Sequence, residues 1–76
     1  MELQEIISSV RGVYPSSTIQ AGNNKWRSAR YIITRFYWRD RRISWVQVGL
    51  GGETQEEAWS AAWEAITKEM LEKLEI

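Results

Sequence analysis

Residues 53–74 read ETQEEAWSAAWEAITKEMLEKL, and this stretch decides the fold. Thr54 and Glu57 form a T-x-x-E capping box, and the acids around Glu57 complement the positive end of a helix dipole. The apolar residues fall on one broad stripe at helical spacing, namely Ala58, Trp59, Ala62, Trp63, Ile66, Met70 and Leu74. The sequence therefore predicts a long amphipathic helix over residues 54–74.

The segment before this helix has the composition of β-strands. A short strand at residues 18–21 meets GNN at residues 22–24, which tolerates the positive φ angles of hairpin turns. Residues 26–38 are rich in β-branched and aromatic side chains and long for one strand, so a bulge or bend is expected there. RDR at residues 39–41 is the expected second turn, and residues 43–50 the third strand. The simplest topology is a three-stranded antiparallel meander.

A short helix is predicted over residues 2–11, because Leu3, Ile6, Ile7 and Val10 form one apolar stripe. Gly12 then suits the position just after a helix. The chain is expected to form one α+β domain, residues 1–76, in the order α-β-β-β-α. Its parts are a helix at 2–11, a sheet at 18–50 and a helix at 54–74.

Alternation along the strands predicts which side chains face the long helix. In the third strand the inward set is Ser44, Val46, Val48 and Leu50, and the outward set is Ile43, Trp45, Gln47 and Gly49. In the middle strand the inward set is Ile32, Thr34, Phe36 and Trp38, and the outward set is Tyr31, Ile33, Arg35, Tyr37 and Arg39. A bulge between Ile32 and Ile33 would exchange the two sets downstream of it.

Charge is segregated along the chain although the total is zero. Residues 1–50 carry eight basic and three acidic side chains, and residues 51–76 carry two lysines and seven glutamates. The basic half also holds most of the aromatic residues. Cations interleaved with flat rings suit contact with phosphates and bases, or with an acidic protein surface.

The predicted outer face of the sheet is the candidate contact surface. It would present Tyr31, Arg35, Tyr37, Arg39 and Trp45, with Arg41 and Arg42 at the hairpin end. Stacking a base on an exposed ring contributes about 1–3 kcal/mol, and arginine can grip phosphates or read guanine edges. Three readings stay open. The first helix buries its stripe on this face, or the face contacts nucleic acid, or it docks a protein.

The composition argues against catalysis. Without histidine or cysteine, the commonest general base, thiol nucleophile and zinc ligands are missing, so we expect no enzyme, no metal and no cofactor. No apolar run approaches the roughly 20 residues of a membrane span. The N-terminus carries acids where a signal peptide needs positive charge. We expect a cytoplasmic protein without membrane contact.

The centre of the chain resembles the sheet-plus-helix DNA-binding domains of plant ethylene-response factors and the arm-binding domains of tyrosine recombinases. The likeness lies in GNNKW at residues 22–26, the arginine-bearing strand at 27–35, and VGL at 48–50 followed by ETQEEA at 53–58. In those families the sheet lies in the major groove of DNA. The resemblance implies that the contacting residues are Lys25, Trp26, Arg27, Arg30 and Arg35. The N-terminal helix is an addition to those families' pattern.

Two looser resemblances concern the order of the elements. The chain is similar to the double-stranded-RNA-binding domain in its α-β-β-β-α order. That family needs basic residues at the start of its last helix, where this chain has Gln55, Glu56 and Glu57. The same order, with its Glu-Thr-x-x-Glu-Ala-Trp segment, looks like small phage proteins, which often inhibit host machinery.

The sequence therefore predicts a non-catalytic protein that binds nucleic acid or a nucleoprotein through a basic, aromatic sheet face. The alternative is a small phage-encoded inhibitor that binds a host defence protein directly in the host cytoplasm, through its acidic helix. Self-association into a homodimer is a third reading, because aromatic surface is in surplus for 76 residues.

Overall fold

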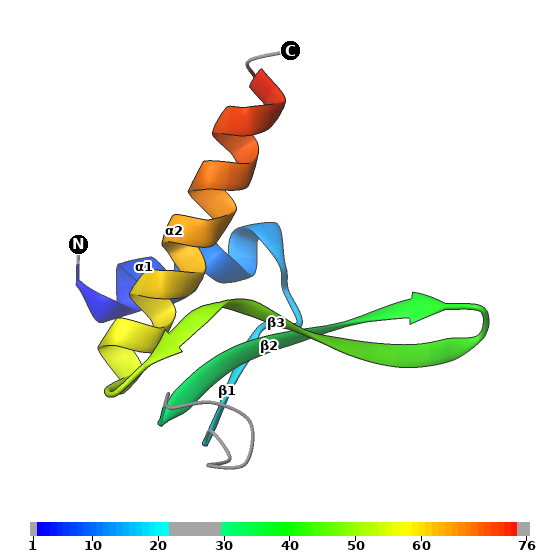
Figure 1. Ribbon diagram of the computed structural model, residues 1–76, viewed down its shortest axis with the longest axis horizontal. Coiled ribbons are helices and arrows are strands. Elements are labelled where there is room, and N and C mark those ends of the chain that lie inside the picture. Colours follow the sequence, from blue (N-terminus) through cyan, green and yellow to red (C-terminus); the bar gives the residue numbers. More distant parts are fainter. Residues whose placement is uncertain (1, 22–29, 75–76) are drawn as a thin grey trace.

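The computed structural model describes residues 2–21 and 30–74. Its elements confirm the predicted α+β class and the order α-β-β-β-α (Figure 1). They are α1 (Leu3–Val13), β1 (Thr18–Ala21), β2 (Tyr31–Arg39), β3 (Arg42–Gly52) and α2 (Gln55–Leu74). The turn expected at residues 22–24 lies outside the described residues.

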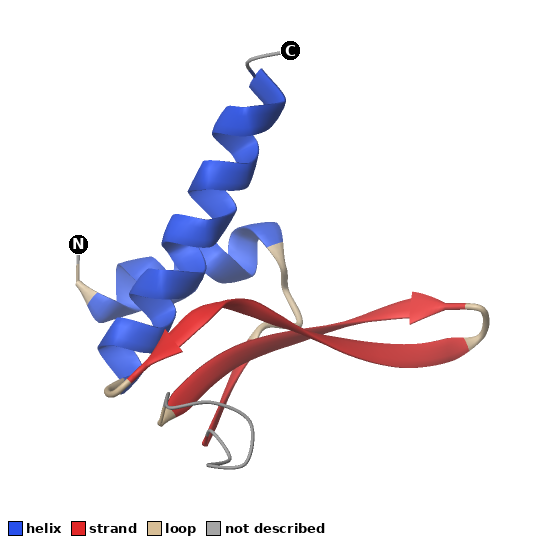
Figure 2. Ribbon diagram, viewed as in Figure 1, coloured by secondary structure: helices blue, strands red, loops and turns tan. Residues whose placement is uncertain are grey.

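The strands form one antiparallel sheet in the order β1-β2-β3, which is the predicted meander. Thr18 lies opposite Thr34, so β1 pairs only with the first half of β2. Beyond Thr34, β2 and β3 continue as a two-stranded ribbon that projects away from the helices (Figure 2). We call residues 35–46 the hairpin arm.

The start of α2 is fixed by the predicted capping box. The backbone N–H of Glu57 donates to Oγ1 of Thr54 at 3.1 Å, which satisfies a donor that the helix itself leaves free. Glu57 Oε2 accepts from the backbone N–H of Glu53 at 3.0 Å, one residue before the position that the usual motif contacts. Both bonds hold the first turn of α2 in place. The apolar stripe therefore packs against the core from its first residue, Ala58.

The core lies between the sheet and the two helices. It contains Ile6 and Val10 of α1, Ile33 of β2, Val48 of β3, and Ala58, Trp59, Ala62 and Ile66 of α2. Figure 1 shows α1 beside α2, on the same side of the sheet. The opening helix therefore does not lie on the side of the sheet opposite α2, so the reading that places it there is wrong about the side. Its expectation that Tyr31 and Ile33 belong to the packing around the core is met, because Ile33 is in the core and Tyr31 packs against it.

The first helix is longer than the sequence predicts. It continues through Gly12 to Val13, and the N–H of Tyr14 donates to the carbonyl of Val10 at 2.8 Å. Gly12 therefore lies inside the helix, and its expected role after the C-terminus was wrong. A Cβ at this position would meet nothing within 4 Å.

An irregularity in β3 moves Leu50 out of the core. Tyr31 pairs with Gly52 and Ile33 pairs with Val48, so residues 49–51 of β3 lie opposite the single residue Ile32. This confirms the irregularity expected near Ile32 and Ile33 of β2. The extra residues, however, belong to β3. Leu50 is 83% exposed, so its predicted place in the core was wrong.

Glycine at position 49 lets the sheet and α2 approach closely. The φ angle of Gly49 is 79°, in the left-handed region, and a Cβ there would lie 2.7 Å from the backbone carbon of Ala61. Any other residue would push α2 away from β3. The contact fixes the height of the helix above the strand.

The two faces of β2 are the reverse of the prediction. Ile33 is fully buried between Ile19 of β1 and Val48 of β3, on the side that faces the helices. Arg35 and Tyr37 follow Ile33 at every second position, so they share its face. The outward set predicted for β2 was therefore wrong, while Val46 and Val48 of β3 face the helices as predicted.

The last turns of α2 extend beyond the sheet (Figure 1). Met70 is 47% and Leu74 is 81% exposed, so the sheet covers the predicted stripe only as far as Ile66. None of the helices in the described part of the chain is both long enough and apolar enough to cross a membrane.

Candidate binding site on the hairpin arm

The tip of the hairpin arm is a two-residue turn formed by Asp40 and Arg41. Their φ angles are 52° and 66°, so both residues are left-handed, which is the pattern of a type I′ hairpin turn. The left-handed conformation costs a residue with a Cβ roughly 1 kcal/mol or more, and glycine avoids this cost. The turn thus keeps an arginine where glycine would be more stable.

Three arginines gather around this turn without an acidic partner. Arg39 and Arg42 lie directly opposite each other across the strands, and like charges in this position repel. Arg41 adds a third exposed guanidinium, and Asp40 is the only acid in residues 35–46. The single ion pair found within residues 2–21 and 30–74 joins Lys73 to Glu69, far along α2. The tip is therefore a concentrated positive charge at the end of a projecting arm.

One side of the arm continues this positive charge toward the helices. We call it the basic face; its residues are Arg35, Tyr37, Arg39, Arg42, Ser44 and Val46. The guanidinium of Arg35 lies 4.1 Å from the ring centroid of Tyr14 and 5.6 Å from that of Tyr37. Such cation–π contacts hold the side chain in place. Arg35 is half-buried, so it connects the arm to the body as well as carrying charge.

A narrow groove adjoins Arg35 at the base of the arm. It has a volume of about 230 Å³ and lies between β3 and α2, lined in part by Arg35, Val46 and Glu69. The hydroxyl of Tyr14 donates to Oε2 of Glu69 at 3.5 Å across this groove. The carboxylate of Glu69 would repel a phosphate at the base, so the tip is the better place for an anion.

The other side of the arm is apolar. We call it the aromatic face; its residues are Phe36, Trp38, Ile43 and Trp45. They are 39%, 68%, 50% and 57% exposed. The rings of Phe36 and Trp45 meet edge to face with centroids 5.3 Å apart and planes at 66°. No charged side chain belongs to this face of residues 35–46, whereas the basic face carries three arginines.

Trp45 does not share a face with Arg35, Tyr37 and Arg39, so the predicted single basic and aromatic surface was wrong. Phe36 and Trp38, which alternation along β2 predicts to point inward, belong to the exposed aromatic face, so that prediction was also wrong. The length of the turn determines which residues of the two strands share a face. A two-residue turn at positions 40 and 41 puts Phe36 opposite Trp45, and residues opposite each other share a face.

The remaining predicted contact residues lie elsewhere or outside the described residues. Arg30 packs over the ring of Tyr31 at 5.9 Å, at the far end of β2. Arg39 is nine positions farther along the chain, or roughly 30 Å in an extended strand. Arg30 is therefore not part of the tip. Lys25, Trp26 and Arg27, expected to contact nucleic acid, lie outside the described residues.

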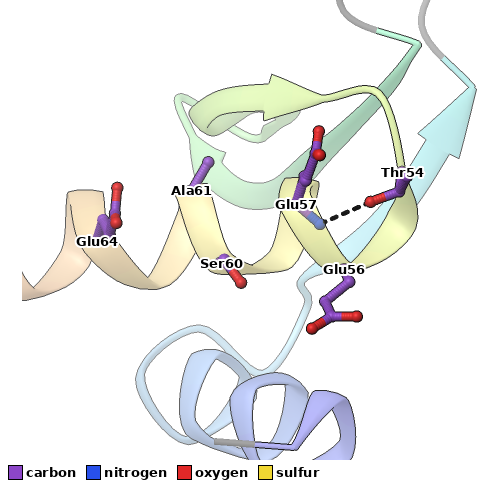
Figure 3. A pocket seen from close by; sticks show the side chains of 6 residues that line it. All are labelled: Thr54, Glu56, Glu57, Ser60, Ala61 and Glu64. Atoms are coloured by element: carbon purple, nitrogen blue, oxygen red, sulfur yellow. Dashed lines mark hydrogen bonds between the residues drawn. The ribbon is translucent and has the colours of Figure 1, made fainter.

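The acidic side of α2 carries a shallow hollow of about 410 Å³ (Figure 3). Its polar lining includes the carboxylates of Glu56, Glu57 and Glu64, all exposed. Figure 3 shows the bond that the backbone N–H of Glu57 donates to Thr54 at the start of the helix. The carboxylate of Glu57 accepts from the backbone N–H of Glu53, so one of the three carboxylates already has a structural role. This negative surface would repel phosphate. Net negative charge therefore lies on α2, and net positive charge lies on the hairpin arm.

We compared the chain with protein-family models, with curated proteins and with solved structures. None of the three comparisons gives a match. The geometry and charge of the hairpin arm are therefore the features from which a function can be inferred.

Proposed function

We propose that this protein is a non-catalytic nucleic-acid-binding protein that inserts the tip of its hairpin arm into a groove of the duplex. The observation that carries the proposal is the cluster of Arg39, Arg41 and Arg42 at a projecting tip without an acidic partner in the described chain. A phosphate between these guanidinium groups would relieve their repulsion and release counterions.

The shape of the arm favours duplex DNA. The major groove of B-form DNA is about 12 Å wide and admits a two-stranded β-ribbon, whereas the major groove of an RNA duplex is too narrow for side chains to read. Arginine is the residue that most often reads guanine there, through its O6 and N7 atoms. The resemblance to sheet-based DNA-binding domains points to the same groove, although here the tip rather than the sheet face enters it.

Salt dependence is the direct test. Affinity for a duplex of about 20 base pairs, measured by fluorescence anisotropy, should fall by orders of magnitude between low and physiological salt. Arg41→Ala and Arg42→Ala should each weaken binding and reduce the slope of log affinity against log salt by about 1. Lys68→Ala removes one exposed charge from α2 and is the matched control, with no expected effect on the slope.

Two outcomes would contradict the proposal. One is the absence of binding to duplex DNA at low salt, whether or not single strands or duplex RNA bind. The other is an equal loss on Lys68→Ala and Arg41→Ala, because the contact would then be unspecific attraction rather than insertion of the tip.

Direct binding to a host protein, as a small inhibitor, is the second candidate function. The exposed aromatic face favours it, since protein interfaces are enriched in tryptophan and phenylalanine. It predicts a complex that survives nuclease treatment and tolerates salt. In that case Trp45→Ala would abolish binding, and Arg41→Ala would leave it intact.

A further inference from the structure

The aromatic face is a large, continuous apolar surface for a chain of this size. It comprises four large side chains, each between 39% and 68% exposed, on a chain of 76 residues. With about 200 Å² per side chain, roughly 400 Å² of apolar surface is exposed on each copy. Patches of this size on monomers often mark interaction sites.

We propose that the aromatic face is a homodimer interface, in which two hairpin arms stack face to face and antiparallel about a twofold axis. In this arrangement the Phe36–Trp45 pair of one copy lies on the Trp38–Ile43 pair of the other. A twofold interface needs a surface that complements itself. Rings and aliphatic groups meet this requirement because they have no charge to match.

The distribution of charge favours a second copy as the occupant. The arginines of the strands, Arg35, Arg39 and Arg42, all lie on the basic face, so stacking the aromatic faces brings no two of them together. The antiparallel orientation also keeps the two Arg41 turns at opposite ends of the stack. A parallel orientation would place the two tips side by side and is disfavoured by their repulsion.

The area is sufficient for a weak dimer. Complete burial of the four side chains on both copies would remove about 800–900 Å² from water, somewhat less than the roughly 1,000 Å² at which specific interfaces begin. Gln47, which follows Trp45 on the same face of β3 and is exposed, adds to the buried area. Because the area is at the lower limit, we expect a dissociation constant on the order of 10 µM or weaker.

Side-chain hydrogen bonds occupy edge groups of β2 at the base of the arm and one of β3 beside the arm, which disfavours the addition of a strand at these two points. The hydroxyl of Ser16 occupies the outer edge of β2 at Phe36, and the side-chain amide of Gln47 donates to the carbonyl of Gly49 at 2.9 Å on β3. Side chains that bond to edge groups in this way discourage pairing with another chain. The open apolar surface is therefore the face of the ribbon.

Sedimentation equilibrium of the full chain, without nucleic acid, tests this inference separately from the proposed function. The average mass should rise from monomer to dimer between about 5 and about 500 µM, and added salt should leave the association unchanged or strengthen it. Ile43→Lys places a charge in the interface and should weaken association at least tenfold. Ser44→Lys adds the same charge to the neighbouring residue on the basic face and should have little effect.

A measurement on the unmodified protein guards against a variant that fails to fold. The indole N–H signals of Trp38 and Trp45 should shift with protein concentration in ¹H–¹⁵N spectra, whereas the signal of the buried Trp59 should not. A monomer at every concentration overturns the inference, whether or not the protein binds DNA. It is also overturned by a dimer that salt dissociates, since that would be contact between basic arm and acidic α2, or by equal effects of Ile43→Lys and Ser44→Lys.

Discussion

The hydroxyl of Ser16 bonds twice to the backbone of Phe36: its Oγ donates to the carbonyl and accepts from the N–H, each at 3.1 Å. Ser16 thus takes the place of a neighbouring strand just before the start of β1, where Thr18 pairs with Thr34. A side chain closes the edge of β2 at the point where the hairpin arm leaves the body.

Ser16→Ala should open this edge. We expect a loss of about 1 kcal/mol in the free energy of unfolding, because Phe36 loses two hydrogen bonds. Hydrogen exchange at the amide of Phe36 should accelerate, while that of Ile33 in the core should not. Ser16→Thr keeps the hydroxyl and is the matched control. Equal protection of Phe36 in all three proteins would show that the bonds do not persist in solution.

Two glycine-to-alanine substitutions should have opposite effects. Gly49→Ala forces a Cβ to within 2.7 Å of the Ala61 backbone at a left-handed φ angle, and should cost about 3 kcal/mol or more. Gly12→Ala adds a Cβ in open space inside α1 and should gain about 1 kcal/mol from helix propensity. Thermal unfolding followed by circular dichroism measures both. A stable Gly49→Ala would mean that α2 does not lie this close to β3.

Thr34→Val should stabilise the protein. Oγ1 of Thr34 is buried and has no hydrogen-bond partner within the described part of the chain. Desolvation of the hydroxyl therefore destabilises the fold, because no hydrogen bond compensates for it. Replacing it by a methyl group should gain about 1 kcal/mol, which is a rise of roughly 4–8 °C in Tm for a domain of this size. Thr18→Val, at the half-buried position opposite, should change Tm less. A lower Tm for Thr34→Val would show that the hydroxyl has a partner.

Arg41→Gly should separate stability from binding. Glycine relieves the left-handed backbone at the tip, so the free energy of unfolding should rise by about 0.5–1 kcal/mol. The same change removes one tip charge and should weaken DNA binding by the proposed route. Arg41→Ala should weaken binding equally without the gain in Tm. If Arg41→Gly keeps full affinity, the tip does not contact DNA.

The pattern of residues gives the order of elements reliably and the faces of the arm poorly. The helix at residues 54–74 follows from its cap and its stripe, both of which are local features. The faces of β2 depend on the turn. A three-residue turn at positions 39–41 would pair Trp38 with Arg42, whereas the observed two-residue turn pairs Trp38 with Ile43. This shift by one residue exchanges the faces of one strand relative to the other.

The turn length was hard to infer because Asp40-Arg41 is an unusual type I′ sequence, which asparagine and glycine normally form. Leu50 was misplaced for a different reason. Alternation assumes a regular strand, and residues 49–51 leave the ladder where two glycines adopt left-handed angles. In both cases a backbone conformation, and not a side-chain preference, decided the position.

Because β1 starts opposite Thr34 and pairs with no residue farther along the arm, nothing in the core depends on how far the ribbon runs beyond that point. The length of the hairpin arm can therefore change without a change in the core. Two residues added to each strand would carry the turn about 7 Å farther out and return every side chain to its original side. One residue added to each strand would move the side chains at the tip to the opposite face of the ribbon. Evolution or protein design could therefore change the length of the hairpin arm in steps of two residues per strand without affecting how the rest of the domain folds.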